Sequence, residues 1–204
     1  MSRGILVHDW IEPTGGSEKV VDEFAALFPG TPLFCLWSND PARFPGREVH
    51  ESWLSRTPLR DRKALSLAVM SRAMRHADTH GAEWALVSSH SFAHHFASDG
   101  RARRIPTCIY VHSPARYLWA PEVDPRGQSR AVRGVAGAFR AVDRKYAGTG
   151  AAYSVNSRYI AQRVRRSWGL DSEVSHPPID VTSLREPATP ATDAELETLA
   201  SLPD

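Results

Sequence analysis

Short, continuous apolar runs alternate along the chain with segments in which apolar residues recur every three or four positions. Continuous runs are typical of strands buried on both faces, and the wider spacing is typical of helices that pack on one side. The runs predict strands over residues 4–8, 32–37, 84–88, 105–111, 151–155 and 173–176. The spaced segments predict helices over residues 17–28, 61–77, 130–146 and 157–168.

This alternation predicts an α/β fold, a Rossmann-like doubly wound parallel sheet with helices on both faces. We assign residues 1–184 to this domain. Residues 185–204 are rich in Pro, Thr, Ala and acidic side chains, which predicts a linker or tail. In doubly wound folds, ligands bind beyond the carboxyl ends of the strands. The search for chemistry therefore narrows to the loops that follow Val7, Ser88, Val111 and Val155.

The chain has 204 residues, 42% of them hydrophobic, which is enough for one large domain with its own core. No apolar run approaches the ~20 residues of a membrane span, and the first residues lack the apolar run of a signal peptide. We therefore expect a cytoplasmic protein. Cys35 and Cys108 each lie inside an apolar run, which predicts two buried thiols rather than a disulfide, a metal site or redox chemistry.

Charge is distributed unevenly along the chain. Lys and Arg number 25 against 23 Asp and Glu, and acids outnumber bases in the last twenty residues. The predicted domain is therefore basic and the tail acidic. This excess of positive charge comes with no aromatic-basic repeat and no nucleic-acid-binding motif, so we expect no nucleic-acid partner.

Two glycines, Gly15 and Gly16, stand at the start of the first predicted helix, and Glu18 follows them. Glycines at a helix start let backbone N–H groups approach an anion, and the helix dipole favours negative charge there. The motif therefore suggests a phosphate site. It is neither the GxGxxG fingerprint nor a Walker A loop, and a plain turn with an N-cap explains it about as well.

A second loop carries His90 and His94 after the strand that ends at Ser88. Their i, i+4 spacing lets both side chains share a helix face, which raises the question of a metal site. No Glu, Asp or third His stands at the spacing of a zinc-protease motif, so we predict no metal. The favoured interpretation is a hydroxyl-rich loop in which His90 contacts a ligand at the strand end.

The loop after Val111 is the most distinctive. His112 leaves the strand directly into a Pro-containing turn, and Arg116 and Tyr117 follow. A titratable group beside a cation and flat apolar surfaces is the combination that sugar and phosphate binding needs. A lone His at a strand end is also often a structural hydrogen-bonding group, and this loop alone does not decide between the two.

The fourth loop leads into the helix predicted over residues 157–168. Arg158 lies near the entrance of this helix, where it can meet an anion. Most of the segment needs no function, since Asn156 or Ser157 is a natural N-cap and Gly169 closes the helix. Three further bases near the helix end fit the helix dipole and solvent, namely Arg163, Arg165 and Arg166.

Together these segments resemble a known family. VHDW at 7–10, GGSEKV at 15–20, HSPARYLW at 112–119, NSRYIAQRVRRSWG at 156–169 and HPPID at 176–180 occur in the order and spacing of bacterial family 4 retaining glycosyltransferases. The similarity is to the amino-terminal half of these enzymes, and it is greatest to the mannosyltransferase-like members of surface polysaccharide assembly. It spans nearly all of residues 3–184.

The resemblance implies one half of a GT-B architecture, in which two Rossmann-like domains enclose the reaction and the amino-terminal domain mainly holds the acceptor. It implies transfer of a hexose from a nucleotide diphosphate sugar with retention and without a metal or other cofactor. Gly15 and Gly16 would lie beside the donor diphosphate. His112 would be the catalytic residue, which positions and polarises rather than attacks, and Arg116 and Tyr117 would shape the pocket.

In the family, the carboxyl-terminal half supplies an Arg/Lys pair for the diphosphate and two Glu residues for the nucleotide and the donor sugar. The acids of the tail, Glu186, Glu195 and Glu197, match nothing of that pattern. We therefore expect activity only with a carboxyl-terminal nucleotide-binding domain, in cis or in trans.

The alternative is a non-catalytic module that binds a lipid-linked sugar or phosphate at the inner face of the membrane. A basic segment with interspersed apolar residues favours such peripheral contact. A helix packed on the sheet with Arg on its wet face explains the same pattern. The bases concerned are Arg56, Arg60, Arg62, Lys63, Arg72 and Arg75.

Overall fold

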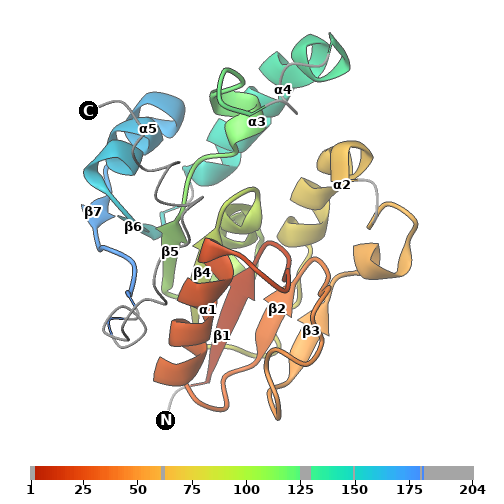
Figure 1. Cartoon of the computed structure of the whole chain (residues 1–204), viewed down its shortest axis with the longest axis vertical. Coiled ribbons are helices and arrows are strands. Elements are labelled where there is room, and N and C mark those ends of the chain that lie inside the picture. Colours follow the sequence, from red (N-terminus) through yellow and green to blue (C-terminus); the bar gives the residue numbers. More distant parts are fainter. Residues whose placement is uncertain (1–2, 61–62, 125–129, 149, 180, 182–204) are drawn as a thin grey trace, which may run out of the picture.

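The computed structural model describes residues 3–60, 63–124, 130–148, 150–179 and 181. Its centre is a seven-stranded sheet in which all neighbouring strands are parallel, in the order β3-β2-β1-β4-β5-β6-β7 (Figure 1). The strands are β1 (Gly4–His8), β2 (Leu33–Cys35), β3 (Val49–Glu51), β4 (Trp84–Ser89), β5 (Thr107–Val111), β6 (Ala152–Val155) and β7 (Glu173–Val174).

Helices lie on both faces of this sheet, as predicted. The α-helices are α1 (Gly16–Leu27), α2 (Lys63–Arg75), α3 (Arg116–Trp119), α4 (Arg130–Ala147) and α5 (Arg158–Trp168). Short 3-10 helices are η1 (Trp53–Arg56), η2 (Ala93–Ser98) and η3 (Ala102–Arg104). The fold is therefore the predicted α/β, Rossmann-like parallel sheet.

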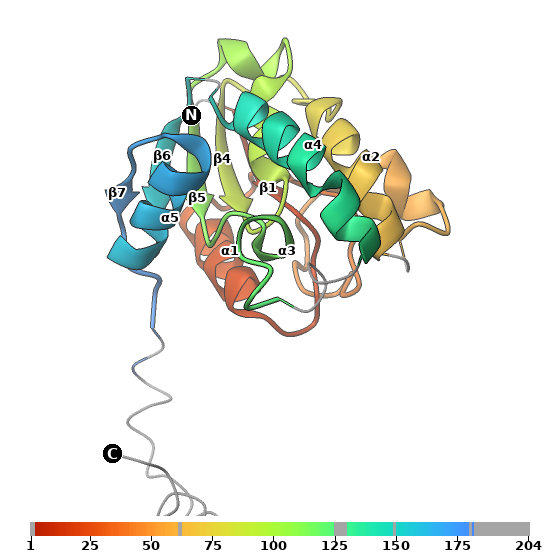
Figure 2. The same cartoon turned by 90° about the horizontal axis from the view of Figure 1, so that it is seen from above.

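Alternate residues of β1, β2 and β4 face two separate cores. Ile5 and Val7 of β1 belong to a large core formed with α2, η2, α4 and α5, whereas Leu6 belongs to a smaller core with α1. Figure 2 shows α1 on one side of the sheet and α2 and α4 on the other. Strands β1 to β3 are added in sequence toward one edge of the sheet, and β4 to β7 are added toward the other, so the order reverses between β1 and β4. The carboxyl ends of β1 and β4 therefore flank the switch point where doubly wound folds bind ligands.

The predicted strands and long helices all form, with ends displaced by a few residues. The short elements β3, α3, η1, η2 and η3 were not predicted. Strand β3 contains only Val49, His50 and Glu51 and lies at the sheet edge, so none of its side chains is buried. Such a segment lacks the continuous apolar run by which buried parallel strands are recognised.

The prediction of two buried thiols holds for Cys35 and is wrong for Cys108. Cys35 is buried, and this burial raises the pKa of its thiol. Cys108 is exposed, although it lies on the sheet face on which α1 packs, because α1 covers only part of that face. Helix α1 packs over β1, β2 and β4, whereas Cys108 on β5 and the adjacent Ala152 on β6 lie beyond it.

Two further sequence predictions concern residues outside the described part of the chain. The acidic linker at 185–204 lies wholly outside the described residues, as does Arg62 of the basic segment. Among the helices that the structure does describe, none combines the length and the apolar character that crossing a membrane requires.

Candidate functional site

A cleft of about 660 Å³ lies where the loops after β1, β4, β5 and β6 converge. These are the four loops that the sequence singled out. Six of the predicted site residues line the cleft: Gly16, Glu18, His90, His112, Arg116 and Tyr117. The structure adds further lining side chains that were not predicted, among them Trp10, Asn156, Tyr159 and Arg163.

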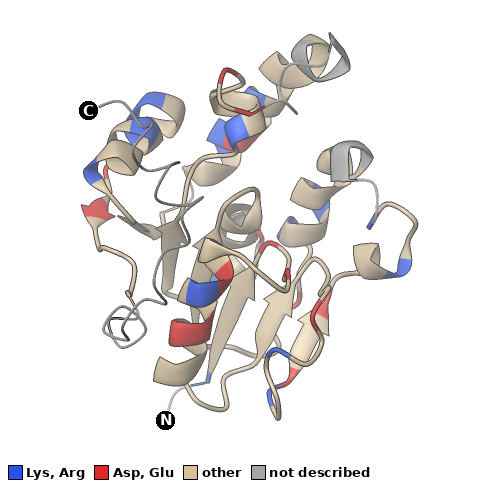
Figure 3. Cartoon of the chain, in the orientation of Figure 1, with Lys and Arg blue, Asp and Glu red and all other residues tan. Residues whose placement is uncertain are grey.

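Helix α5 contributes a different arginine from the predicted one. Arg158 is exposed and does not line the cleft, whereas Arg163 does, one turn after Tyr159. Residues spaced by four share a helix face, which explains why Tyr159 and Arg163 line the cleft together. The terminal nitrogen Nη2 of Arg163 is buried and has no hydrogen-bond partner. A cation with an unused donor therefore lies in the cleft wall, and Figure 3 shows other Lys and Arg residues along α4 and α5.

The start of α1 contains Gly15, Gly16 and Glu18, and hydrogen bonds to the Glu18 carboxylate hold it in place. The Glu18 side chain is buried, and its carboxylate accepts a hydrogen bond from the Ser17 hydroxyl at 2.7 Å and from the Glu12 backbone N–H at 3.2 Å. A Cβ on Gly15 would lie 2.0 Å from Glu18 Oε2, while a Cβ on Gly16 would meet open space. Gly15 therefore makes room for the carboxylate, which interacts favourably with the amino-terminal end of the helix. That the glycines face a donor diphosphate stays a prediction.

Asp9 builds the loop that carries His90. Its buried carboxylate accepts four backbone N–H groups, from His90 and Ser91 at 2.8 Å and from Phe92 and Ala93 at 2.7 Å. A carboxylate that accepts several backbone donors fixes the loop without help from a regular element. Sequence reasoning missed this role, although an acid at the end of a buried strand is itself a signal.

Aromatic rings and hydroxyls hold the other lining side chains. The Trp10 indole stacks on Trp37 and meets the edge of His90, with ring centroids 5.4 and 4.4 Å apart. The Ser91 and Tyr117 hydroxyls are 2.7 Å apart. These contacts place flat apolar surfaces beside polar groups, as a sugar-binding cleft requires.

His112 stands at the end of a chain of buried polar groups. Its Nε2 lies 2.8 Å from Ser88 Oγ, and Ser88 Oγ lies 3.0 Å from Nδ1 of His8. Burial lowers the pKa of His112 to about 4, and burial together with the charge of His90 lowers that of His8 to about 3. Both rings are therefore neutral near pH 7, and Asn156 holds the His112 backbone by donating to its carbonyl at 3.0 Å.

Asp143 of α4 ties together the elements that carry the cleft. Its Oδ1 lies 3.0 Å from Nε2 of both His94 and His95, and its Oδ2 accepts from the indoles of Trp119 at 2.6 Å and Trp168 at 2.8 Å. Burial alone would raise the pKa of Asp143, but these histidine contacts outweigh it and hold the pKa far below its usual range.

His94, His95 and Asp143 are the group among the described residues with the composition of a metal site. The other ring nitrogens face hydroxyls: His94 Nδ1 lies 3.0 Å from Ser89 Oγ, and His95 Nδ1 lies 2.8 Å from Ser71 Oγ. All ring nitrogens and both carboxylate oxygens thus have partners, which is the arrangement of a satisfied structural network. His90 precedes η2 and lines the cleft, whereas His94 lies in η2 and contacts Ser89 and Asp143, so the two do not share a helix as their spacing suggested.

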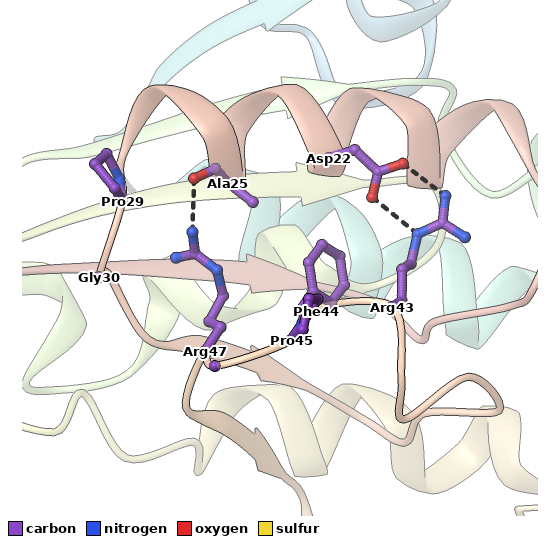
Figure 4. A pocket seen from close by; sticks show the side chains of 9 residues that line it. Asp22, Ala25, Pro29, Gly30, Arg43, Phe44, Pro45 and Arg47 are labelled. Atoms are coloured by element: carbon purple, nitrogen blue, oxygen red, sulfur yellow. Dashed lines mark hydrogen bonds and ion pairs between the residues drawn. The ribbon is translucent and has the colours of Figure 1, made fainter.

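A second hollow, of about 460 Å³, lies between α1 and the segment before β3 (Figure 4). None of the predicted site residues lines it. Arg43 pairs with both carboxylate oxygens of Asp22, at 2.9 and 2.7 Å, and Arg47 donates to the carbonyls of Ala25, Phe28 and Thr31. Both guanidinium groups serve the fold, Arg47 by satisfying carbonyls at the end of α1.

Comparison with known proteins places most of the chain in one family. The family model described as Glycosyltransferase Family 4 matches residues 14–183. The chain belongs to glycosyltransferase family 4. The matched range includes every lining residue of the cleft except Trp10 and Glu12. No curated protein matches this family 4 chain.

Among solved structures, the family 4 chain is similar to CalG4, the calicheamicin glycosyltransferase. The two sequences are 17% identical, the TM-score is 0.48, and 95% of this chain aligns with 55% of that one. The family 4 chain thus spans about half the length of this solved relative.

Proposed function

We propose that this family 4 domain is the acceptor-side half of a retaining GT-B glycosyltransferase. In this proposal, a hexose, mannose-like in kind, passes from a nucleotide diphosphate sugar to an acceptor of surface polysaccharide or glycolipid assembly. The reaction needs no metal or other cofactor, and it does need a carboxyl-terminal nucleotide-binding domain in cis or in trans. Transferase lineage follows from the family, whereas the donor, the acceptor and the stereochemistry belong to the proposal.

The observation that carries the proposal is the convergence of four loops on one cleft at the switch point of the sheet. This cleft offers two imidazole rings, those of His90 and His112, as partners for sugar hydroxyls, and aromatic surface from Trp10 and Tyr159. Arg116 and Arg163 add positive charge for an anionic group of the donor or acceptor. Sugar recognition needs this combination of flat apolar surface and a few fixed polar groups.

His112 suits a positioning role rather than attack or proton abstraction. A pKa near 4 makes the uncharged ring a weak base, and Ser88 already occupies Nε2. One ring nitrogen is left for a substrate oxygen. In this proposal His112 orients and polarises the sugar, and the leaving phosphate takes the acceptor proton.

A transfer assay tests the function. The chain is assayed alone and joined to a family 4 carboxyl-terminal domain, with UDP- and GDP-hexoses as donors, and products are identified by mass spectrometry. We expect transfer only with the second domain, with retention of anomeric configuration, and a loss of about 100-fold in rate for His112→Ala. Arg166→Ala is the control, because Arg166 lies on α5 outside the cleft.

Two results would contradict the proposal. Robust turnover by the 204-residue chain alone would refute the need for a second domain. Equal rates for His112→Ala and Arg166→Ala would refute the placement of the reaction in this cleft.

The second candidate function is a binding module at the membrane surface. Trp53 is 47% exposed beside Arg56, and Arg72 of α2 is also exposed, which favours contact with anionic lipid. Against this, Arg60 donates to the Ser38 carbonyl at 2.6 Å and Arg75 donates to the Tyr146 hydroxyl at 2.8 Å. Sedimentation with anionic liposomes, before and after neutralisation of Arg60, Arg62 and Arg72, separates this role from a purely soluble one.

A further inference from the structure

The hydrogen bonds behind His112 form a chain with a fixed direction. His8 ends β1, Ser88 is its partner in β4, and His112 follows β5, so three adjacent parallel strands contribute one group each. The links measure 3.0 Å from His8 Nδ1 to Ser88 Oγ and 2.8 Å from Ser88 Oγ to His112 Nε2. Each group has a limited set of protons, and the direction follows from counting them.

The direction is set at His8. Its Nδ1 also lies 3.2 Å from the Ser88 backbone carbonyl, which can only accept a hydrogen bond. Nδ1 therefore carries the proton. The other nitrogen, Nε2, is buried and has no partner. Placing the proton on Nδ1 leaves an unpaired acceptor there, whereas the opposite tautomer would leave a buried N–H unpaired, which proteins avoid more strictly.

The direction passes through Ser88 to His112. Since His8 Nδ1–H donates toward Ser88, the hydroxyl oxygen acts as acceptor on that side, and its single proton points to His112 Nε2. His112 Nε2 is then an acceptor and carries no proton. The ring is neutral, since burial lowers its pKa to about 4, so the ring proton must lie on Nδ1.

We propose that His8 and Ser88 are positioning residues that fix His112 in the Nδ1–H tautomer, so that this ring offers a hydrogen-bond donor to a substrate oxygen. The ring can then bind a hydroxyl lone pair or a carboxylate or phosphate oxygen, and it cannot take a proton from an acceptor hydroxyl through Nδ1. The tautomer is a property of the chain alone, whereas its use on a sugar rests on the proposed function.

Two-bond ¹H–¹⁵N correlation spectra of the histidine rings test the tautomer directly. In the unliganded chain at pH 7.5, we expect His112 to show a protonated Nδ1 and a pyridine-like Nε2. In Ser88→Ala, the constraint is lost and the Nε2–H form, which histidine prefers in water, should become the majority. A protonated Nε2 on His112 in the wild type would overturn the proposal, as would an unchanged tautomer in Ser88→Ala.

Variants at His8 test the origin of the direction. His8→Asn places an amide N–H₂ near the former Nδ1 and should preserve the His112 tautomer, whereas His8→Phe has no donor and should relax it. Ser113→Ala is the control, because Ser113 adjoins His112 but bonds to Pro114 O. The amide spectrum shows whether His8→Phe is folded. If the folded variant keeps the wild-type tautomer of His112, the assigned role of His8 is wrong. A change of the His112 tautomer in Ser113→Ala would also overturn it.

A second experiment tests whether the His112 tautomer matters for glycosyl transfer by the two-domain enzyme. His112→Asn keeps a donor near Nδ1, whereas His112→Gln places its amide nearer Nε2. We expect His112→Asn to retain at least about 10-fold more activity than His112→Gln, equivalent to about 1.4 kcal/mol. The reverse ranking contradicts donation from Nδ1. If the wild-type enzyme shows no transfer at all, the proposed function fails while the spectra still decide the tautomer.

Discussion

Replacement of Asp143 tests whether one buried carboxylate holds the cleft-bearing elements together. Asp143→Leu keeps the branched shape of the side chain, although Leu is larger, and it removes the acceptor of four donors. These belong to His94, His95, Trp119 and Trp168. The histidines can shift their protons to Nδ1 and donate to Ser89 and Ser71 instead. The indole N–H groups cannot change tautomer, so they lose their acceptor.

The magnitude follows from the groups left unpaired. Each buried donor without an acceptor costs about 1–3 kcal/mol, so two indoles and two weakened histidine contacts predict a loss of about 4 kcal/mol. Asp143→Asn should cost about half as much, because its amide N–H₂ can donate to both histidines while its oxygen still accepts from the indoles. Losses of this size are a large part of the stability of an ordinary domain.

Equilibrium unfolding in urea, followed by circular dichroism and extrapolated linearly, measures these losses. Asp171→Leu is the matched control, because Asp171 is an exposed acid at 3.3 Å from Arg165 and should change stability by no more than about 0.5 kcal/mol. The cycle Asp143→Leu with Trp168→Phe should be non-additive, since the second change removes an orphaned donor. A loss below about 1 kcal/mol in Asp143→Leu, or an additive cycle, would refute the reasoning.

Two other predictions concern acid stability and the glycine turn. Burial lowers the pKa of His8 to about 3 and those of His95 and His112 to about 4, from 6.5, so the unfolded chain binds protons first as pH falls through 6.5. Each of these histidines then lowers the free energy of unfolding by about 1.4 kcal/mol at pH 5.5. Urea unfolding should therefore give a stability about 4 kcal/mol lower at pH 5.5 than at pH 7.5. Equal midpoints at the two pH values would contradict burial of these rings in the neutral form. Gly15→Ala should lower the melting temperature because its Cβ displaces the Glu18 carboxylate. Gly16→Ala adds a Cβ in open space and should have a smaller effect. A lower melting temperature for Gly16→Ala than for Gly15→Ala, measured by calorimetry, would contradict this.

The sheet could be predicted because the burial of each strand leaves a pattern within that strand's own sequence. Strands covered on both faces must be apolar throughout, which marks β1, β4 and β5 in the sequence. Cys108 shows the limit of that rule, since an apolar run does not reveal that α1 covers only part of one sheet face. Edge strand β3 shows the converse, because a strand without buried side chains carries no apolar run.

The site was predictable as a set of loops and less so as a set of contacts. Strand ends identified the loops of His90 and His112, because parallel strands bring their carboxyl ends to one edge. Helical spacing from Tyr159 would have pointed to Arg163 rather than Arg158. Asp143 also left a signal, since it lies one turn from Phe139 and from Ala147 on the packed side of α4, yet its partners are distant in sequence and only the fold brings them to it.

We propose that the family 4 chain binds sugar in the cleft at the strand ends rather than in the hollow of Figure 4. Titration of the ¹⁵N-labelled chain with α-mannose 1-phosphate, which carries both a hexose and a phosphate, measures this most directly. We expect saturable shifts of the amides of His90, His112, Arg116 and Arg163, and their loss in His112→Ala. Shifts centred on Asp22, Arg43 and Arg47, or the absence of saturable shifts at the cleft, would contradict the account.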